Sequence, residues 1–129
     1  MPTLATKYPM EETSMRGNIF NYEAEGAIPA FRIAKFGTQD DRRALADDEG
    51  TLAGITTDVG CSQAGDRIDV QEDGETRLRL GGDVVAGDWL TSDPDGKGIA
   101  ATEGAIVAQA KEAGTLNSVI RVNITRFIK

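Results

Sequence analysis

Short runs of alternating apolar and polar residues, each ended by glycine, aspartate, asparagine or proline, constrain this chain more than any other feature. A period of two places every second side chain on one face of an extended strand, whereas a helix needs apolar residues three or four positions apart. No stretch keeps a helical stripe, and the nearest, residues 39–50, is a polar excursion with at most one short strand. The sequence therefore predicts an all-β fold. The alternating strands are expected at residues 30–36, 67–73, 76–80, 88–93 and 118–127, with more apolar, interior strands at 52–57 and 105–111.

The stretch "DPDGKG", which begins at Asp93, resembles the start of a calcium-binding loop. Such a loop needs an oxygen ligand at its fifth position and a glutamate at its twelfth, where this chain has Lys97 and Gly104. An Asp-Gly pair between two extended runs is instead typical of a hairpin turn, here at Asp95 and Gly96. We predict a hairpin and no metal site.

A second Asp-Gly pair, Asp73 and Gly74, lies between residues 67–72 and 75–80. It carries the strongest hairpin signal in the chain and predicts that these two strands pair with each other.

One phrase recurs in the β region: "AGDRIDV" (64–70), "AGDWLTS" (86–92) and, more loosely, "AGTLNSVIRV" (113–122). The first and third follow similar apolar strands at a separation of about fifty residues. The repeat predicts two related β-halves within one small barrel or sandwich domain over residues 27–129, preceded by an extended N-terminal arm.

The composition excludes several classes of chemistry. With no histidine and a single cysteine, Cys61, the chain has no Ser-His-Asp or Cys-His catalysis, no histidine-based zinc site and no internal disulfide. Its paired carboxylates lie in polar loops where little shift in pKa is expected. We predict that the protein is not an enzyme and needs no cofactor.

A net charge of −7 without a basic, aromatic-rich stripe argues against a nucleic-acid partner. No apolar run is long enough for a signal peptide or a membrane span, so we expect a soluble protein without a membrane partner.

Residues 1–26 differ from the rest because they are rich in large apolar side chains but lack a regular period. The interpretations are a frayed tail, a segment lying on its own domain, or an arm that packs on another subunit. We favour the arm, with Phe20 and Tyr22 as its main anchors. Its candidate partner-binding residues are Tyr8, Met10, Met15, Ile19, Phe20 and Tyr22.

From Ala27 to Lys129 the sequence resembles the decoration, or cement, proteins of tailed-bacteriophage capsids. The resemblance rests on a Gly-Ile strand, then Ala-Gly-Asp and a strand, then a hairpin of the form Ala-Gly-Asp-x-Leu-Thr-Ser-Asp-x-x-Gly. The matching residues are Gly54-Ile55, Ala64-Gly65-Asp66, Ala86-Gly87-Asp88, Thr91-Ser92-Asp93 and Gly96.

This resemblance implies a virion protein, made in the host cytoplasm, that binds the outer surface of the assembled head. It also implies that the partners are the major capsid protein and further copies of the chain, as a homotrimer or alternatively a homodimer. Such a protein would stabilise contacts between capsid subunits without catalysis.

Two alternatives remain. A tail or fibre accessory domain that binds carbohydrate would present exposed aromatic platforms, so the burial of Trp89 separates it from a decoration protein. The phrase "AGDRIDV" is also similar to an Ala-Gly-x-Ile-Asp motif of trimeric dUTP pyrophosphatases. That family continues with Tyr-Arg-Gly, whereas this chain has Gln71, Glu72 and Asp73.

Overall fold

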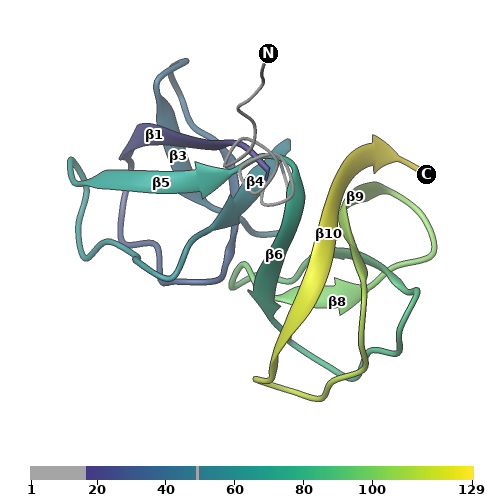
Figure 1. Ribbon diagram of the computed structural model, residues 1–129. Coiled ribbons are helices and arrows are strands. Elements are labelled where there is room, and N and C mark those ends of the chain that lie inside the picture. Colours follow the sequence, from purple (N-terminus) through teal and green to yellow (C-terminus); the bar gives the residue numbers. More distant parts are fainter. Residues whose placement is uncertain (1–16, 49) are drawn as a thin grey trace, which may run out of the picture.

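The computed structural model describes residues 17–48 and 50–129, which form strands and turns and contain no helix (Figure 1). The predicted all-β fold is confirmed. The strands of the first half are β1 (Ile19–Ala24), β2 (Ile33–Phe36), β3 (Arg42–Leu45), β4 (Leu52–Thr56) and β5 (Arg67–Gln71). Those of the second half are β6 (Gly74–Arg79), β7 (Trp89–Ser92), β8 (Gly98–Ala100), β9 (Ala105–Ala110) and β10 (Val119–Ile128).

The first five strands close into a barrel in the order β1-β3-β2-β4-β5. Four of its pairings are antiparallel, while β1 and β3 run parallel. β4 is buried at every position, as predicted for residues 52–57, because it faces the barrel interior on one side and the second half on the other. Closure leaves the barrel with no free sheet edge.

The other five strands form a second sheet that repeats the barrel's topology. In the barrel, β2 pairs with β3 and β4, β4 pairs with β5, and β5 pairs with β1. In the second sheet, β7 pairs with β8 and β9, β9 pairs with β10, and β10 pairs with β6. Even the parallel contact recurs, as a bridge between Leu80 and Gly98. The predicted relation between two β-halves is confirmed, and β6–β10 correspond in order to β1–β5.

The same turn precedes β2, β5, β7 and β10. In each, the residue two positions before the strand has a positive φ: Phe31, Gly65, Gly87 and Asn117. In the third copy of the phrase, the residue that corresponds to the glycine of the first two copies is therefore Asn117. The sequence had suggested the glycine of the third Ala-Gly pair instead. Asparagine tolerates this left-handed conformation better than most residues, which explains the substitution.

In three of these turns, the polar residue after the positive-φ position accepts a backbone hydrogen bond from within the turn. Asp88 Oδ2 accepts a hydrogen bond from the backbone N–H of Val85 at 3.0 Å, and Ser118 Oγ accepts one from Thr115 at 3.2 Å. Asp66 accepts one from Ser62 at 3.3 Å. The recurring Ala-Gly-Asp phrase is therefore a structural signal for beginning a strand.

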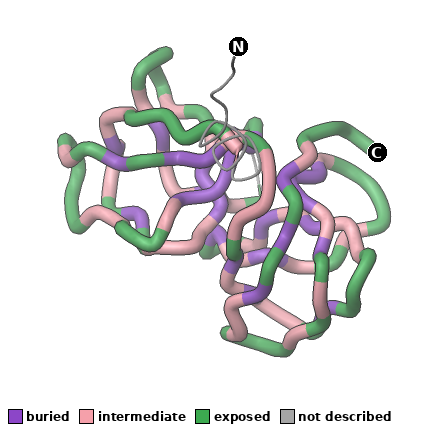
Figure 2. The backbone as a smooth tube through the Cα atoms, viewed as in Figure 1, coloured by how far each residue is buried: buried purple, intermediate pink, exposed green. Residues whose placement is uncertain are grey.

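One of two apolar clusters extends across the boundary between the halves. The larger cluster fills the second sheet and includes Ile33, Leu52 and Ile55 from the barrel. A smaller cluster, which contains Ile68 and Val70, fills the barrel interior. Figure 2 shows the buried segments running through both halves while the turns lie at the surface. The larger cluster therefore joins the two repeats by apolar packing across their boundary.

The turn at residues 93–98 forms the predicted hairpin between β7 and β8. Asp93 Oδ1 accepts hydrogen bonds from the backbone N–H groups of Asp95 at 2.8 Å and Lys97 at 2.9 Å. The hairpin also contacts the barrel, since the backbone N–H of Ile33 donates to the carbonyl of Gly96 at 2.7 Å. The Asp93 carboxylate thus caps a turn that joins the two halves.

The hairpin predicted at Asp73 and Gly74 is wrong. β5 pairs with β1 and β4, and β6 pairs with β10, so this corner carries the chain from the barrel to the second sheet. Gln71 Nε2 supports the corner by donating to the carbonyls of Asp73 and Glu75, each at 2.8 Å. Both edges of β5 are occupied by barrel strands, so long-range pairing overrides the local turn signal.

The structure describes only the last part of the predicted arm, residues 1–26, beginning at residue 17. Residues 19–24 form β1, which pairs with β5 over five positions and closes the barrel, so this part of the predicted arm belongs to the β domain. Residues 1–16 lie outside the described residues. The sequence missed β1 because its large side chains stand on both faces of the strand.

Replacing Gly96 tests the contact between the hairpin and the barrel. Gly96 has a φ of 77°, and a Cβ there would lie 2.5 Å from Leu45 Cδ1 and 3.1 Å from the Ile33 carbonyl. We expect Gly96→Val to lower the free energy of unfolding by roughly 1–3 kcal/mol, measured by denaturant titration. Gly82→Ala is the control, because a Cβ at Gly82 would meet no atom within 4 Å and the change should be nearly neutral. Equal stabilities of the two variants would contradict the packing described above.

Candidate functional site

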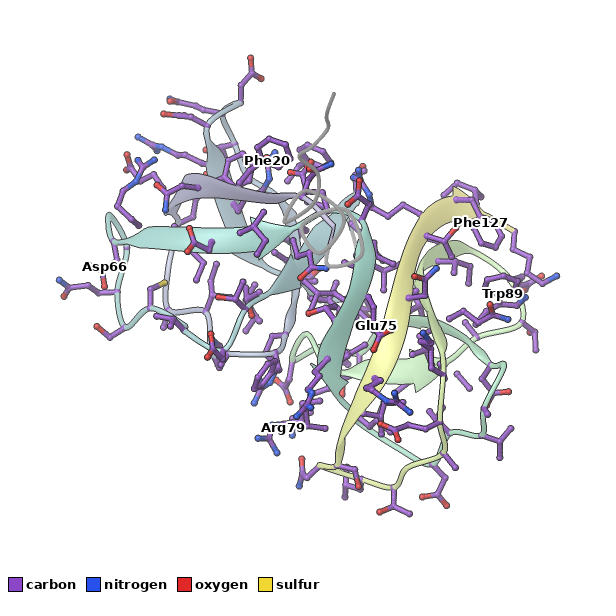
Figure 3. All side chains as sticks on the ribbon, viewed as in Figure 1. Phe20, Asp66, Glu75, Arg79, Trp89 and Phe127 are labelled. Atoms are coloured by element: carbon purple, nitrogen blue, oxygen red, sulfur yellow. The ribbon has the colours of Figure 1, made fainter. Side chains whose placement is uncertain are left out.

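The site begins with the inward face of β1, where Phe20, Tyr22 and Ala24 alternate with outward-facing residues. Phe20 lies opposite Val70 and Tyr22 opposite Ile68, and both partners belong to the barrel core. Ala24 is fully enclosed, but Phe20 is 47% exposed because it lies at the end of the barrel (Figure 3). The face therefore passes from the core to an open rim.

Arg43 fills this rim from β3. Its side chain is buried, and its guanidinium carbon lies 3.8 Å from the centre of the Tyr22 ring and 4.3 Å from that of Phe36. Nη1 donates to the carbonyls of Asp40 at 3.0 Å and Arg42 at 2.8 Å. A guanidinium between two aromatic rings is a stable way to bury a cation, since each such contact contributes about 0.5–2 kcal/mol.

We call Phe20, Tyr22, Phe36 and Arg43 the aromatic rim. Phe36 is 43% exposed, so both phenylalanines present apolar surface to solvent, and Phe36 does so beside the buried guanidinium of Arg43. Exposed aromatic side chains of this kind are typical anchors of protein–protein interfaces. The rim is therefore a candidate for such an interface.

Tyr22 also bonds to the end of the barrel's last strand. Its hydroxyl donates to Glu72 Oε2, and burial, followed by this hydrogen bond and the nearby carboxylate charge, raises the pKa of Tyr22 above its usual value. Arg43 lowers the pKa and is a smaller cause. The phenol is therefore held neutral as a hydrogen-bond donor.

The second sheet lacks this rim although it has the same topology. There a Cβ on Gly98 would lie 2.5 Å from Leu78 Cδ2, so leucine occupies the space that Arg43 fills in the barrel. The strand registers place Leu78, Ser92 and Gly98 at the positions of Tyr22, Phe36 and Arg43. The two repeats thus fill the same place in different ways, the barrel with Arg43 between two aromatic rings and the second sheet with Leu78 against Gly98.

The structure brings together only some of the predicted site residues. Phe20 and Tyr22 belong to the aromatic rim, whereas Ile19 faces away from it and lies in a surface hollow of about 380 Å³ beside Phe31 and Thr76. Tyr8, Met10 and Met15 lie outside the described residues. Sequence reasoning missed Phe36 and Arg43, because the parallel pairing of β1 with β3 that brings them to Tyr22 leaves no local signal.

Trp89 is half-buried and packs edge-to-face against Phe127, with ring centres 5.0 Å apart (Figure 3). Its ring is therefore partly covered by another side chain.

Cys61, Asp66 and Arg67 line an open hollow of about 470 Å³ at the other side of the barrel. The Cys61 thiol donates to the Gly26 carbonyl at 3.5 Å. Within residues 17–48 and 50–129, no three histidine, cysteine, aspartate or glutamate side chains are grouped to hold a metal ion. The same residues include no helix that could cross a membrane.

Comparison of the sequence with protein-family models and with curated proteins gives no match. Among solved structures, the fold is similar to the crystal structure of the head fiber gp8.5 N base of bacteriophage phi29. The TM-score is 0.65 with 16% sequence identity, and the match covers 87% of this chain and 97% of that chain. At this identity the likeness shows the fold.

Ionisation of Tyr22 provides a test of the rim. A raised pKa in the folded state means that the contribution to stability is fully present below about pH 10 and is lost as the pH rises through the folded-state value. Glu72→Gln removes the carboxylate charge, so we expect it to move the pKa of Tyr22 back toward its ordinary value. Absorbance titration of tyrosinate measures this, with Tyr22→Phe to identify the signal of Tyr8. An identical titration of Tyr22 with and without Glu72 would contradict the proposed contact.

Proposed function

We propose that this protein is a structural component of a bacteriophage virion, located on the outer surface of the head, where it binds the major capsid protein and stabilises contacts between capsid subunits. The observation that carries the proposal is the fold match, which spans nearly all of the phi29 head fiber base. The resemblance of residues 27–129 to capsid decoration proteins points in the same direction. We further propose that the chain acts without catalysis or a cofactor.

The aromatic rim supplies the proposed attachment surface. Its exposed phenylalanines are suited to an apolar groove on a partner, and the contact with Arg43 supports the ring of Phe36. Many copies bound to one lattice would turn a modest interface into a large effect on the shell.

We propose that residues 1–16 extend this surface as the attachment arm. The described chain begins beside the rim, where Asn18 donates from its backbone N–H to Asp73 Oδ1 at 2.6 Å and accepts from the backbone N–H of Glu72 at 2.9 Å. Glu72 also binds Tyr22, so the arm would leave the domain next to the rim. By family resemblance we propose a homotrimer, with a homodimer as the alternative.

A second candidate is the base of a head fibre, which the name of the matched structure favours. A base would attach to the same head surface and support a projecting component, with no need to strengthen the shell. The two candidates share a location and differ in their mechanical effect.

The stability of heads without the protein separates these candidates. If the chain cements the shell, heads made without it should break at lower temperature or under milder osmotic shock than wild-type heads, and purified protein should restore their resistance. Genome release, followed by fluorescence of a DNA dye, measures this. Unchanged resistance with normal binding would favour the fibre base, and no binding to heads would contradict both.

Truncation tests the arm and the rim separately. Deleting residues 1–16 should leave a folded domain with weaker binding to heads, whereas deleting residues 1–26 removes β1 and should unfold the barrel.

Phe20→Ala should weaken binding by roughly 1–3 kcal/mol if this ring is an interface anchor. Ile128→Ala, at an exposed apolar residue of the second sheet, is the control. Co-sedimentation with heads measures binding, and circular dichroism reports folding. Full binding by both the 1–16 deletion and Phe20→Ala would contradict the attachment surface.

A further inference from the structure

The outer face of β6 and β10 carries an unusual pair of like charges. Arg77 on β6 lies directly opposite Arg121 on β10, and both side chains are exposed. Like charges at opposing positions of an antiparallel pair destabilise a sheet. This arrangement therefore does not serve the stability of the strands.

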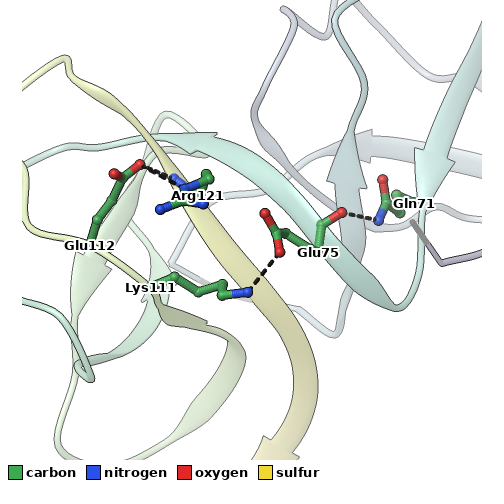
Figure 4. A network of polar contacts seen from close by, with 5 residues as sticks. All are labelled: Gln71, Glu75, Lys111, Glu112 and Arg121. Carbon is green, nitrogen blue, oxygen red and sulfur yellow. Dashed lines mark hydrogen bonds and ion pairs between the residues drawn. The ribbon is translucent and has the colours of Figure 1, made fainter. Parts of the chain in front are cut away.

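Neighbouring carboxylates compensate only part of this charge (Figure 4). Lys111 Nζ lies 2.7 Å from Glu75 Oε1 and holds the pKa of Glu75 below its ordinary value. Glu112 Oε2 lies 3.7 Å from Arg121 Nε and accepts the backbone N–H of Arg121 at 2.7 Å. Among the described residues, none of the ion pairs includes Arg77 or Arg79.

The positive face continues to the last residue of β6, Arg79, and to Lys97 in the turn between β7 and β8. Arg79 Nη1 donates to the carbonyl of Asn117 at 2.7 Å, and Lys97 Nζ donates to its side-chain oxygen at 2.8 Å. Figure 3 shows several nitrogen-tipped side chains beside Arg79. We call this surface the arginine strip. It consists of Arg77, Arg79, Lys97, Lys111 and Arg121.

The internal repeat shows that the fold does not require these arginines. The registers place Asn21 and Asp69 of the barrel at the positions of Arg77 and Arg121. In the barrel this pair consists of one neutral and one acidic side chain, and Asn21 Nδ2 donates a hydrogen bond to Asp69 Oδ1 at 2.9 Å. One repeat thus joins the two opposing side chains by a hydrogen bond, whereas the other places two cations there, of which Arg77 takes part in no ion pair among the described residues.

We propose that the arginine strip is a second docking surface, which binds a carboxylate-rich patch on a protein of the phage head. The inference rests on the proposed function and adds the charge of the partner. The strip is a positive area on a chain with a net charge of −7, so it would orient the protein during encounter. Glu75 and Glu112 lie within the strip, and they suit a protein surface of mixed charge better than a continuous polyanion such as nucleic acid.

Arg77→Glu is the discriminating variant. It places a carboxylate opposite Arg121, so the sheet should remain folded with an unchanged or higher melting temperature. Its affinity for purified heads at low salt should fall by at least about 5-fold, with a weaker dependence on salt. Arg77→Lys keeps the charge and should bind as the wild type does. Arg126→Glu makes the same charge change on β10, but its side chain lies beside Thr51 and Leu52, so it is the matched control and should bind normally.

The outcomes separate the arginine strip from the proposed function. Heads that bind the wild type and Arg77→Glu equally would overturn the strip while leaving attachment to the head intact. Equal losses in Arg77→Glu and Arg126→Glu would indicate an effect of net charge and would also overturn it. Wild-type protein that binds no heads would overturn both. If Arg77→Glu unfolds, Arg77→Gln replaces it, and normal binding by that variant at low salt counts against the strip.

Discussion

The burial of β4 is the constraint on which the rest of the structure depends. This strand pairs with β2 and β5 inside the barrel, and its other face packs against β6, β9 and β10. All five of its residues are buried, and Leu52 and Ile55 join the apolar cluster of the second sheet. With few large aromatics available for the interior, joining two small repeats across one shared strand gives a core that neither repeat would have alone.

The repeat also explains how the chain can carry distinct surfaces on one scaffold. Because matching registers fix matching positions, the two halves can be compared residue by residue within a single molecule. The barrel has an aromatic rim where the second sheet has Leu78 and Gly98, and the second sheet has arginines where the barrel has Asn21 and Asp69. The same strand topology thus accepts different side chains at equivalent positions.

Local signals in the sequence predicted most strands and the hairpin at Asp95 and Gly96, because alternation and turn chemistry are properties of neighbouring residues. They failed at Asp73 and Gly74, where an Asp-Gly turn leads from one sheet to the other and not into a hairpin. The reason is that both edges of the preceding strand, β5, are already paired with β1 and β4. They also missed β1, whose large side chains stand on both faces, and the stacking of Arg43 on Tyr22, which depends on a parallel pairing between distant segments. Phe20 and Tyr22 were recognisable from the sequence as residues needing burial, but the side chains they would meet were not.

The length of β10 has a mechanical consequence. It spans Val119–Ile128, pairs with β6 over Val119–Ile124 and with β9 from Val122 to Ile128, so the two ladders overlap in the middle of the strand. Lys129 and Gly104 exchange two further backbone hydrogen bonds beyond the strand. A pull along the strand axis from its Ile128 end would load these antiparallel ladders in shear, so that many hydrogen bonds resist together instead of opening one after another.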